Sequence, residues 1–331
     1  MPKTYRLLAS ISVFTFTLLF TLTGHGKTLV YCSEGSPESF NPQFSTSGTT
    51  FDASSRQMFN RLVEFKIGST EIIPGLAIRW DVSGDGLEYT FHLRKDVQFH
   101  STEYFTPTRG FNADDVLFTF NRQRDRSHPW YSASGGVYKY FNDMDLGNLI
   151  KDIIKIDDHK VKFILNRPDS PFLSTLAMDF ASLHSREYAD LLMKAGQPQK
   201  FDTQPVGTGP FRFVRYEKDA FIRYAAHENF WRGREKIDKL VFAITVDPSV
   251  RYARLRTGEC HVMAYPLPTD IKSMNNNPEL VVAEQPGLNT AYWAFNVKKS
   301  PFDKTQVRQA MNYAVNRQAI MNVIYKGTGQ I

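Results

Sequence analysis

Residues 75–122 read GLAIRWDVSGDGLEYTFHLRKDVQFHSTEYFTPTRGFNADDVLFTFNR, and the fold can be inferred outward from this stretch. Residues 80–83 (WDVS) lead into the turn 84–86 (GDG), whose two glycines tolerate positive φ. Beyond the turn, residues 89–94 (YTFHLR) alternate apolar with polar side chains, which is the period of a half-buried strand. The pattern therefore predicts a β-hairpin.

A capped helix is predicted directly after the hairpin. Asn112 is a favourable N-cap, and the carboxylates of Asp114 and Asp115 suit the positive N-terminal end of a helix. The buried face is expected to consist of Val116, Leu117, Phe118 and Phe120. A hairpin followed by a helix indicates a domain of mixed α and β structure, but it indicates no function.

The same stretch resembles a known family. From Trp80 to Arg122 it contains W-x-x-S-x-D-G-x-x-Y-T-F-H-L-R-K-x-V-x-F-H and then F-x-A-x-D-V-x-F-x-F-x-R. This wording resembles the signature region of the family 5 extracellular solute-binding proteins, the peptide- and nickel-binding receptors of ABC importers. Further similar blocks are G-T-G-P-F at 207–211, R-x-x-x-L-x-x-G-E at 251–259 and VRQAMNYA at 307–314. Residues 27–50 most resemble the dipeptide and haem/glutathione receptors.

The resemblance implies an α/β fold of the type II periplasmic-binding-protein class, with the extra inserted subdomain of peptide receptors. We expect a signal peptide at 1–26, the core of lobe I at 27–58 and 209–286, an inserted subdomain of lobe I at 59–208, and the start of lobe II at 287–331. Family members continue well beyond the position that matches Ile331. The resemblance therefore also implies that this sequence is truncated and its second lobe incomplete.

Residues 1–26 have the features of a secretory signal peptide. Lys3 and Arg6 precede an apolar run from Leu7 to Leu22, and small residues stand before a cleavage point ahead of Lys27. The alternative is a membrane anchor, but the run is short for a hydrocarbon core of roughly 30 Å. We therefore expect export to the periplasm as a soluble protein.

Cys32 and Cys260 are the only cysteines, and in an exported chain such a pair predicts one disulfide. The bond would place the first strand beside the segment near residue 260. A reactive or metal-binding thiol pair is the alternative, but the eight histidines show no zinc-ligand spacing. His92 and His100 are expected at the surface or in strands. We expect no metal and no cofactor.

The charge pattern argues against a nucleic-acid partner. The formal net charge of +6 becomes +4 when Lys3 and Arg6 are removed with the signal peptide. The remaining charges of both signs are spread along the chain without a Lys/Arg block, whereas nucleic-acid binding usually needs a concentrated basic patch. We expect a solvated, mildly basic surface.

The rest of the chain shows short helical and strand patterns. Strands are predicted at 27–31, 153–156, 161–165, 211–216, 237–245 and 262–265, and helices at 52–62, 172–181, 250–258 and 307–317. Residues 205–211 are expected to form a sharp bend that re-enters the core.

The loop between the first strand and the helix at 52–62 is the candidate ligand-binding segment. It is rich in glycine and hydroxyl side chains, which let a ligand approach the backbone and orient it by hydrogen bonds. A loop that only caps the helix is the alternative; the resemblance favours ligand binding, because the matching loop of peptide-binding members lines their cleft. The expected ligand-binding residues are Thr46, Ser47, Gly48, Thr49, Tyr265 and Tyr292.

The function implied by the resemblance is that of the periplasmic substrate-binding component of an ABC transporter. It would capture dipeptides or other short peptides as a monomer and deliver them to an inner-membrane permease. A haem or glutathione receptor on the same scaffold and a non-functional truncated fragment are the alternatives. Dipeptide receptors hold the charged ends of the ligand with an Asp and an Arg. Both residues come from a part of the receptor chain that has no counterpart in this sequence, so we assign no such residue.

Enzymatic activity is not expected. The sequence contains no nucleophile elbow, no HExxH motif and no pair of carboxylates marked by its spacing. The acidic pairs at 114–115 and 157–158 are typical of a helix N-terminus and a turn.

Overall fold

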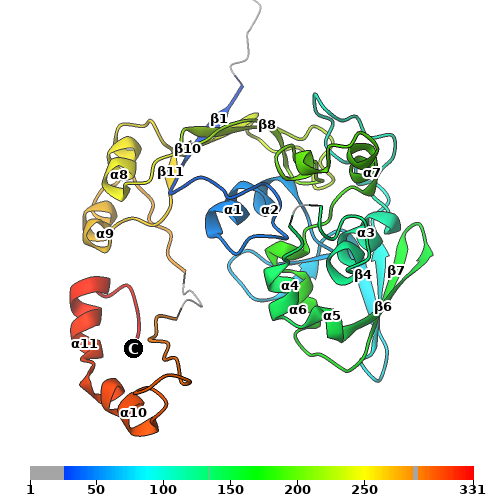
Figure 1. Cartoon of the computed structure of the whole chain (residues 1–331). Helices are drawn as coiled ribbons and strands as arrows, with labels where there is room; N and C mark the ends of the chain where they lie inside the picture. Colours follow the sequence, from blue (N-terminus) through cyan, green and yellow to red (C-terminus); the bar gives the residue numbers. More distant parts are fainter. Residues whose placement is uncertain (1–25, 134, 286–289) are drawn as a thin grey trace, which may run out of the picture.

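The structure is a computed structural model that describes residues 26–133, 135–285 and 290–331 (Figure 1). The predicted signal peptide falls outside these residues, apart from Gly26, and so does the expected start of lobe II at 287–289. Among the described residues, no helix is long and apolar enough to cross a membrane.

A five-stranded sheet joins the beginning of the chain to its middle. Its strand order is β11-β1-β10-β9-β8. The strands are β1 (Thr28–Ser33), β8 (Phe211–Glu217), β9 (Phe221–Ala226), β10 (Lys239–Ile244) and β11 (Val262–Met263). β1 pairs in parallel with both β10 and β11, whereas β9 runs antiparallel to β8 and β10. The first strand therefore lies between two strands that are distant in the sequence.

A four-stranded antiparallel sheet contains the predicted hairpin. Its order is β4-β5-β7-β6, and its strands are β4 (Ala77–Val82), β5 (Glu88–Leu93), β6 (Ile150–Asp157) and β7 (Lys160–Leu165). β5 buries every second side chain, as its alternating pattern predicts. A separate two-stranded ribbon pairs β2 (Val63–Phe65) with β3 (Ile72–Pro74). The hairpin predicted around 84–86 is confirmed, and the strands predicted at 153–156 and 161–165 pair with each other in β6 and β7.

Helix α3 (Ala113–Arg124) follows the hairpin and begins at the predicted cap. The side chain of Asn112 accepts a hydrogen bond from the backbone N–H of Asp114, at 3.0 Å, while Asp115 accepts one from the backbone N–H of Asn112, at 2.9 Å. Asp115 is completely buried, and its carboxylate also accepts two hydrogen bonds from the Arg109 guanidinium. The cap therefore also fixes the loop that precedes the helix.

The remaining helical segments are short. They are α1 (Gly48–Ala53), α2 (Ser55–Met58), α4 (Lys139–Asp143), α5 (Leu146–Leu149), α6 (Phe172–Leu176), α7 (Arg186–Lys194), α8 (Pro248–Arg256), α9 (Pro268–Asn275), α10 (Thr305–Ala314) and α11 (Arg317–Ile320). Two 3₁₀ turns, η1 (Asp179–Ala181) and η2 (Pro198–Asp202), and a π-helical turn, η3 (Met321–Tyr325), complete the set.

Three predicted helices are wrong in their extent. The helix predicted at 52–62 is two short helices, divided at Ser54, whose hydroxyl bonds back to the carbonyl of Thr50, and the second ends at Met58 because Phe59 is extended. The helix at 172–181 breaks where Met178 is extended. The helix at 307–317 ends at Ala314, because Asn316 caps a new helix with its side chain.

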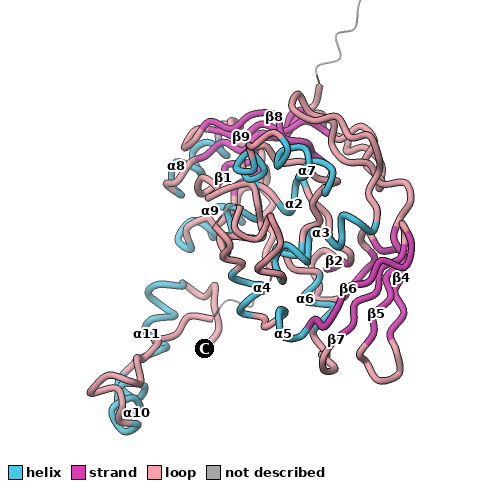
Figure 2. The backbone as a smooth tube through the Cα atoms, turned by 45° about the vertical axis from the view of Figure 1, so that its right-hand side comes forward, coloured by secondary structure: helices cyan, strands magenta, loops and turns pink. Residues whose placement is uncertain are grey.

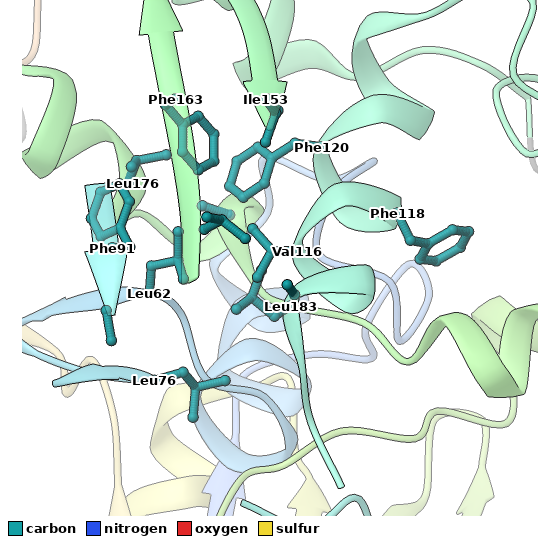
Figure 3. Close-up of a cluster of buried hydrophobic side chains, with 14 of the residues drawn as sticks. Leu62, Leu76, Phe91, Val116, Phe118, Phe120, Ile153, Phe163, Leu176 and Leu183 are labelled. Atoms are coloured by element: carbon teal, nitrogen blue, oxygen red, sulfur yellow. The ribbon is translucent and has the colours of Figure 1, made fainter. Parts of the chain in front are cut away.

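Two separate hydrophobic clusters fill the interior. The larger one consists of residues between Leu62 and Val206; Figure 3 shows Phe120 of α3 against Phe163 of β7, with ring centroids 5.2 Å apart. The smaller one combines residues 40–59 with residues 211–244. Because the two clusters involve different parts of the chain, we propose that residues 59–208 form a subdomain inserted into a core built from 27–58 and 209–286.

The C-terminal segment 290–331 stands apart from both sheets in Figures 1 and 2. None of the residues of α10, α11 or η3 is buried. We propose that this segment is the start of the second lobe.

Two buried histidines bind the backbone of residues 207–209, where the chain returns to the five-stranded sheet. The expectation that His100 lies at the surface or in a strand is wrong, since it is fully buried outside any strand. Its Nε2 bonds the carbonyl of Gly209, at 2.9 Å, and its Nδ1 accepts the N–H of Gly207, at 3.3 Å. His227 Nδ1 bonds the same Gly209 carbonyl, at 3.1 Å. His100 must therefore be neutral to accept the N–H.

Glycine is required at this bend. A Cβ on Gly207 would overlap the Met58 carbonyl, and a Cβ on Gly209 would meet the backbone of Met58. The chain passes from the smaller cluster to the larger one near residue 58 and returns near residue 208. The backbones of these two segments are therefore in contact. The predicted sharp bend at 205–211 is confirmed.

We predict that the chain loses stability in mild acid through His100. Burial, and then the neighbouring His227, lower the pKa of His100 to about 3, whereas an unfolded histidine has a pKa near 6.5. The unfolded state thus binds more protons between these values, so stability is complete above about pH 6.5 and falls as the pH drops toward 3. His100→Gln, which can donate and accept without titrating, should lose less stability over this range than the native chain.

The free energy of unfolding in urea, measured from pH 8 to pH 4, checks this. His261→Gln is the matched control, because His261 is exposed, and it should behave as the native chain does. An equally steep loss in His100→Gln and in the native chain would contradict the prediction.

Cys32 and Cys260 form the predicted disulfide. Their Cα atoms lie 5.8 Å apart across 228 residues of sequence, and both side chains are buried. We predict that replacing both by serine lowers the free energy of unfolding by about 2–5 kcal/mol, because the loop is no longer closed in the unfolded chain. Chemical denaturation of oxidised protein and of the double variant measures the difference. Free thiols in exported native protein, detected by alkylation and mass analysis, would show the pairing to be wrong.

Candidate functional site

The candidate site lies where three parallel strands end. β1, β10 and β11 run in the same direction, so the loops that follow them leave the same edge of the sheet. These loops comprise residues 34–47, 245–247 and 264–267. Ligands of open α/β sheets bind at the carboxyl ends of strands. The topology therefore brings the predicted loop together with a second predicted segment, around Tyr265.

Hydrogen bonds between hydroxyl groups fix the loop after β1. The Ser45 hydroxyl donates to Glu38, at 2.7 Å, and accepts the backbone N–H of Ser47, at 2.9 Å. The hydroxyls of Ser47 and Thr49 lie 2.8 Å apart, and either can be the donor. Hydrogen bonds among its own side chains therefore order the end of this loop, while Phe40 anchors its beginning in the smaller hydrophobic cluster.

The four predicted residues of this loop form the turn that enters α1. Thr46 and Gly48 are exposed, and Ser47 and Thr49 are partly exposed. Ser47 stands at the N-cap position but makes no side-chain capping bond, so helix capping does not account for its hydroxyl. Their contact with a ligand remains a prediction.

Two further polar residues, Tyr31 and Asp52, stand at this edge and were not predicted. The Tyr31 ring packs on Phe242, with centroids 4.6 Å apart. Burial raises the pKa of the Tyr31 hydroxyl, and the charge of Asp52 raises it further. Burial also raises the pKa of Asp52, against the opposing effect of Arg56, whose guanidinium bonds it at 2.5 Å. In the sequence, only the i,i+4 spacing of Asp52 and Arg56 indicates that these two side chains form an ion pair. No pattern singles out Tyr31.

Tyr265 lies just beyond β11, with its side chain 63% exposed. The strand predicted at 262–265 is wrong at its end, because Tyr265 has φ +51° and cannot continue it. Its carbonyl accepts a hydrogen bond, at 3.1 Å, from the buried Arg251 of α8. An exposed aromatic ring is thus held at the same edge as the loop after β1.

Tyr292 is not brought to this edge. It belongs to the segment 290–331, which Figures 1 and 2 show standing apart from α1 and α8, and it is 77% exposed. Its contact with a ligand stays a prediction.

The site is suited to binding. It offers hydroxyl groups, backbone polar groups, one half-buried carboxylate and an exposed phenol ring. Among residues 26–133, 135–285 and 290–331, no cluster of three His, Cys, Asp or Glu side chains is placed to hold a metal ion. The arrangement therefore offers groups that orient a small polar ligand.

Comparison with known proteins gives the family. Residues 71–331 match the family described as "Bacterial extracellular solute-binding proteins, family 5 Middle". The chain belongs to this family. By its description, this is a family of solute-binding proteins.

Two curated relatives are named for dipeptide binding and for haem binding, the two ligands expected from the resemblance. The chain is 56% identical over 303 residues to the "Dipeptide-binding protein" of Escherichia coli (strain K12), covering 92% of this chain and 57% of that protein. It is 51% identical over 302 residues to "Heme-binding protein A" of Haemophilus influenzae, covering 91% of this chain and 55% of that protein. The chain thus spans little more than half the length of the curated relatives it matches.

A solved structure agrees with the fold class. The dipeptide-binding protein of Pseudoalteromonas sp. SM9913, in complex with Met-Leu, matches with a TM-score of 0.88 and 40% sequence identity, over 91% of this chain and 59% of that one. The chain therefore has the α/β fold of the type II periplasmic binding proteins. The coverage agrees with an incomplete second lobe.

Proposed function

We propose that this chain is part of a periplasmic substrate-binding component of an ABC transporter, which captures dipeptides or other short peptides. The single observation that carries this is the 56% identity to a protein named as dipeptide-binding, spread over nearly the whole chain. The related structure that holds Met-Leu supports the same ligand class.

The geometry suggests how lobe I takes part. Residues 46–49, which are exposed or partly exposed, stand with the exposed Tyr265 at one sheet edge and can offer hydroxyl and backbone groups to a peptide. Closure of a second lobe over this edge by hinge motion would bury the ligand. The filled receptor, as a monomer exported to the periplasm, would then dock on an inner-membrane permease.

A haem receptor is the second candidate, because a relative named for haem binding is nearly as similar, at 51% identity. A glutathione receptor shares the scaffold expected from the sequence. Peptide is favoured because a peptide-named relative has the higher identity.

Calorimetric titration of residues 27–331 tests the proposal. We expect Met-Leu to bind with micromolar or tighter affinity, and glutathione and haem to give no comparable signal. Binding of haem or glutathione alone would transfer the proposal to that ligand. No binding signal from any of the three ligands, in protein shown to be folded, would contradict ligand capture by this chain. It would support the alternative of a non-functional truncated fragment.

We predict that Gly48→Phe weakens Met-Leu binding by about tenfold or more, which corresponds to about 1.4 kcal/mol. Nothing lies within 4 Å of a Cβ built on Gly48, so a side chain can leave the backbone there without a clash at its Cβ. Gly84→Phe is the control, because Gly84 is equally open but lies in the turn between β4 and β5. Equal affinities of the two variants in titration, with unchanged melting temperatures, would show that the loop does not contact the peptide.

A further inference from the structure

We propose that Arg251 is a positioning residue of the peptide-binding site: it fixes the backbone of Tyr265 in a strained conformation and so presents the Tyr265 ring to the ligand. This inference rests on the proposed function of the same sheet edge and names how one part of it is built.

Arg251 is a buried charge whose partners are all backbone carbonyl groups. The residue is 3% exposed and lies in the first turn of α8. Its Nη1 donates to the carbonyls of Thr245 and Val246, at 2.9 and 2.7 Å, and its Nη2 donates to that of Tyr265, at 3.1 Å. A guanidinium cannot deprotonate, so these carbonyls must stay aimed at it.

The three carbonyls belong to two different loops of the site. Thr245 and Val246 follow β10, while Tyr265 follows β11, and β1 lies between these strands. One planar fork therefore joins the two loops that flank the strand leading to residues 46–49. A lysine has one nitrogen in place of this fork and cannot reproduce the geometry.

Tyr265 is the residue whose conformation needs such support. Its φ of +51° lies in the left-handed region, which a residue with a Cβ avoids. Strain of this kind persists where surrounding contacts enforce it, and it concentrates at functional sites. The Tyr265 side chain is largely exposed, so the backbone bond to Arg251, rather than packing of the ring, holds the conformation.

The ring is then available to the proposed ligand. A phenol offers an apolar face to peptide side chains and a hydroxyl for hydrogen bonding. The alternative is that Arg251 only stabilises α8 and its loops, with no consequence for Tyr265. The two roles differ in whether Arg251 and residue 265 are energetically coupled.

Melting curves test the coupling without any ligand. Tyr265→Gly should melt at a higher temperature than Tyr265→Ala, because glycine alone relieves the left-handed φ. The same pair of substitutions in an Arg251→Lys background should melt at equal temperatures, because the loop is then free to relax. Gly and Ala variants that melt alike in the native background, or that keep their difference in the Arg251→Lys background, would overturn the proposal.

Titration with Met-Leu tests the consequence for binding. Arg251→Lys and Tyr265→Ala should each weaken binding by about tenfold, and the double variant should be no weaker than Tyr265→Ala alone. Arg256→Lys, an exposed arginine on the same helix, is the control and should bind as the native chain does. Affinity within about twofold of native in Arg251→Lys would overturn the inference. A native chain that binds nothing would refute the proposed function and, with it, the ligand-presenting role.

Discussion

The structure depends on the parallel pairing of β1 with β10 and β11. This pairing is what places the loop after β1 beside the loops around Val246 and Tyr265, and without it the chain has no candidate site. The Cys32–Cys260 disulfide lies at the same junction, between the end of β1 and the start of β11. Backbone pairing and the covalent bond therefore constrain the same contact.

Much of the fold could be predicted because its signals are local. The hairpin around 84–86 and the Asn112 cap depend on residues within a few positions of one another, the glycines and proline of 207–210 mark the bend, and all three features are present. The failures depend on competing or distant partners. The helix predicted at 52–62 is divided at Ser54, whose side chain bonds to the backbone, and helix propensities do not include this bond. His100 is buried in contact with Gly209, and no sequence pattern near residue 100 indicates this contact.

The candidate site was predictable only in part. Residues 46–49 could be found because a polar, glycine-rich loop after a strand is a recognisable ligand-binding pattern, although their ligand contacts stay predictions. Arg251 could not be found, because a buried arginine that donates to three carbonyls looks in sequence like any helical arginine. Tyr265 lies at this edge directly after β11, whereas Tyr292 belongs to the segment 290–331, and the ligand contacts of both stay predictions.

The pairing of β1 also sets an order of assembly. The chain leaves the ribosome from its N-terminus, and β1 pairs with residues over 200 positions later, whereas the sheet of β4 to β7 is built entirely within residues 77–165. Local contacts form faster than distant ones. The inserted region can therefore fold as a nucleus while β1 remains an unpaired strand that is exposed to aggregation or to a chaperone, and the ligand-binding edge is the last part of this lobe to form.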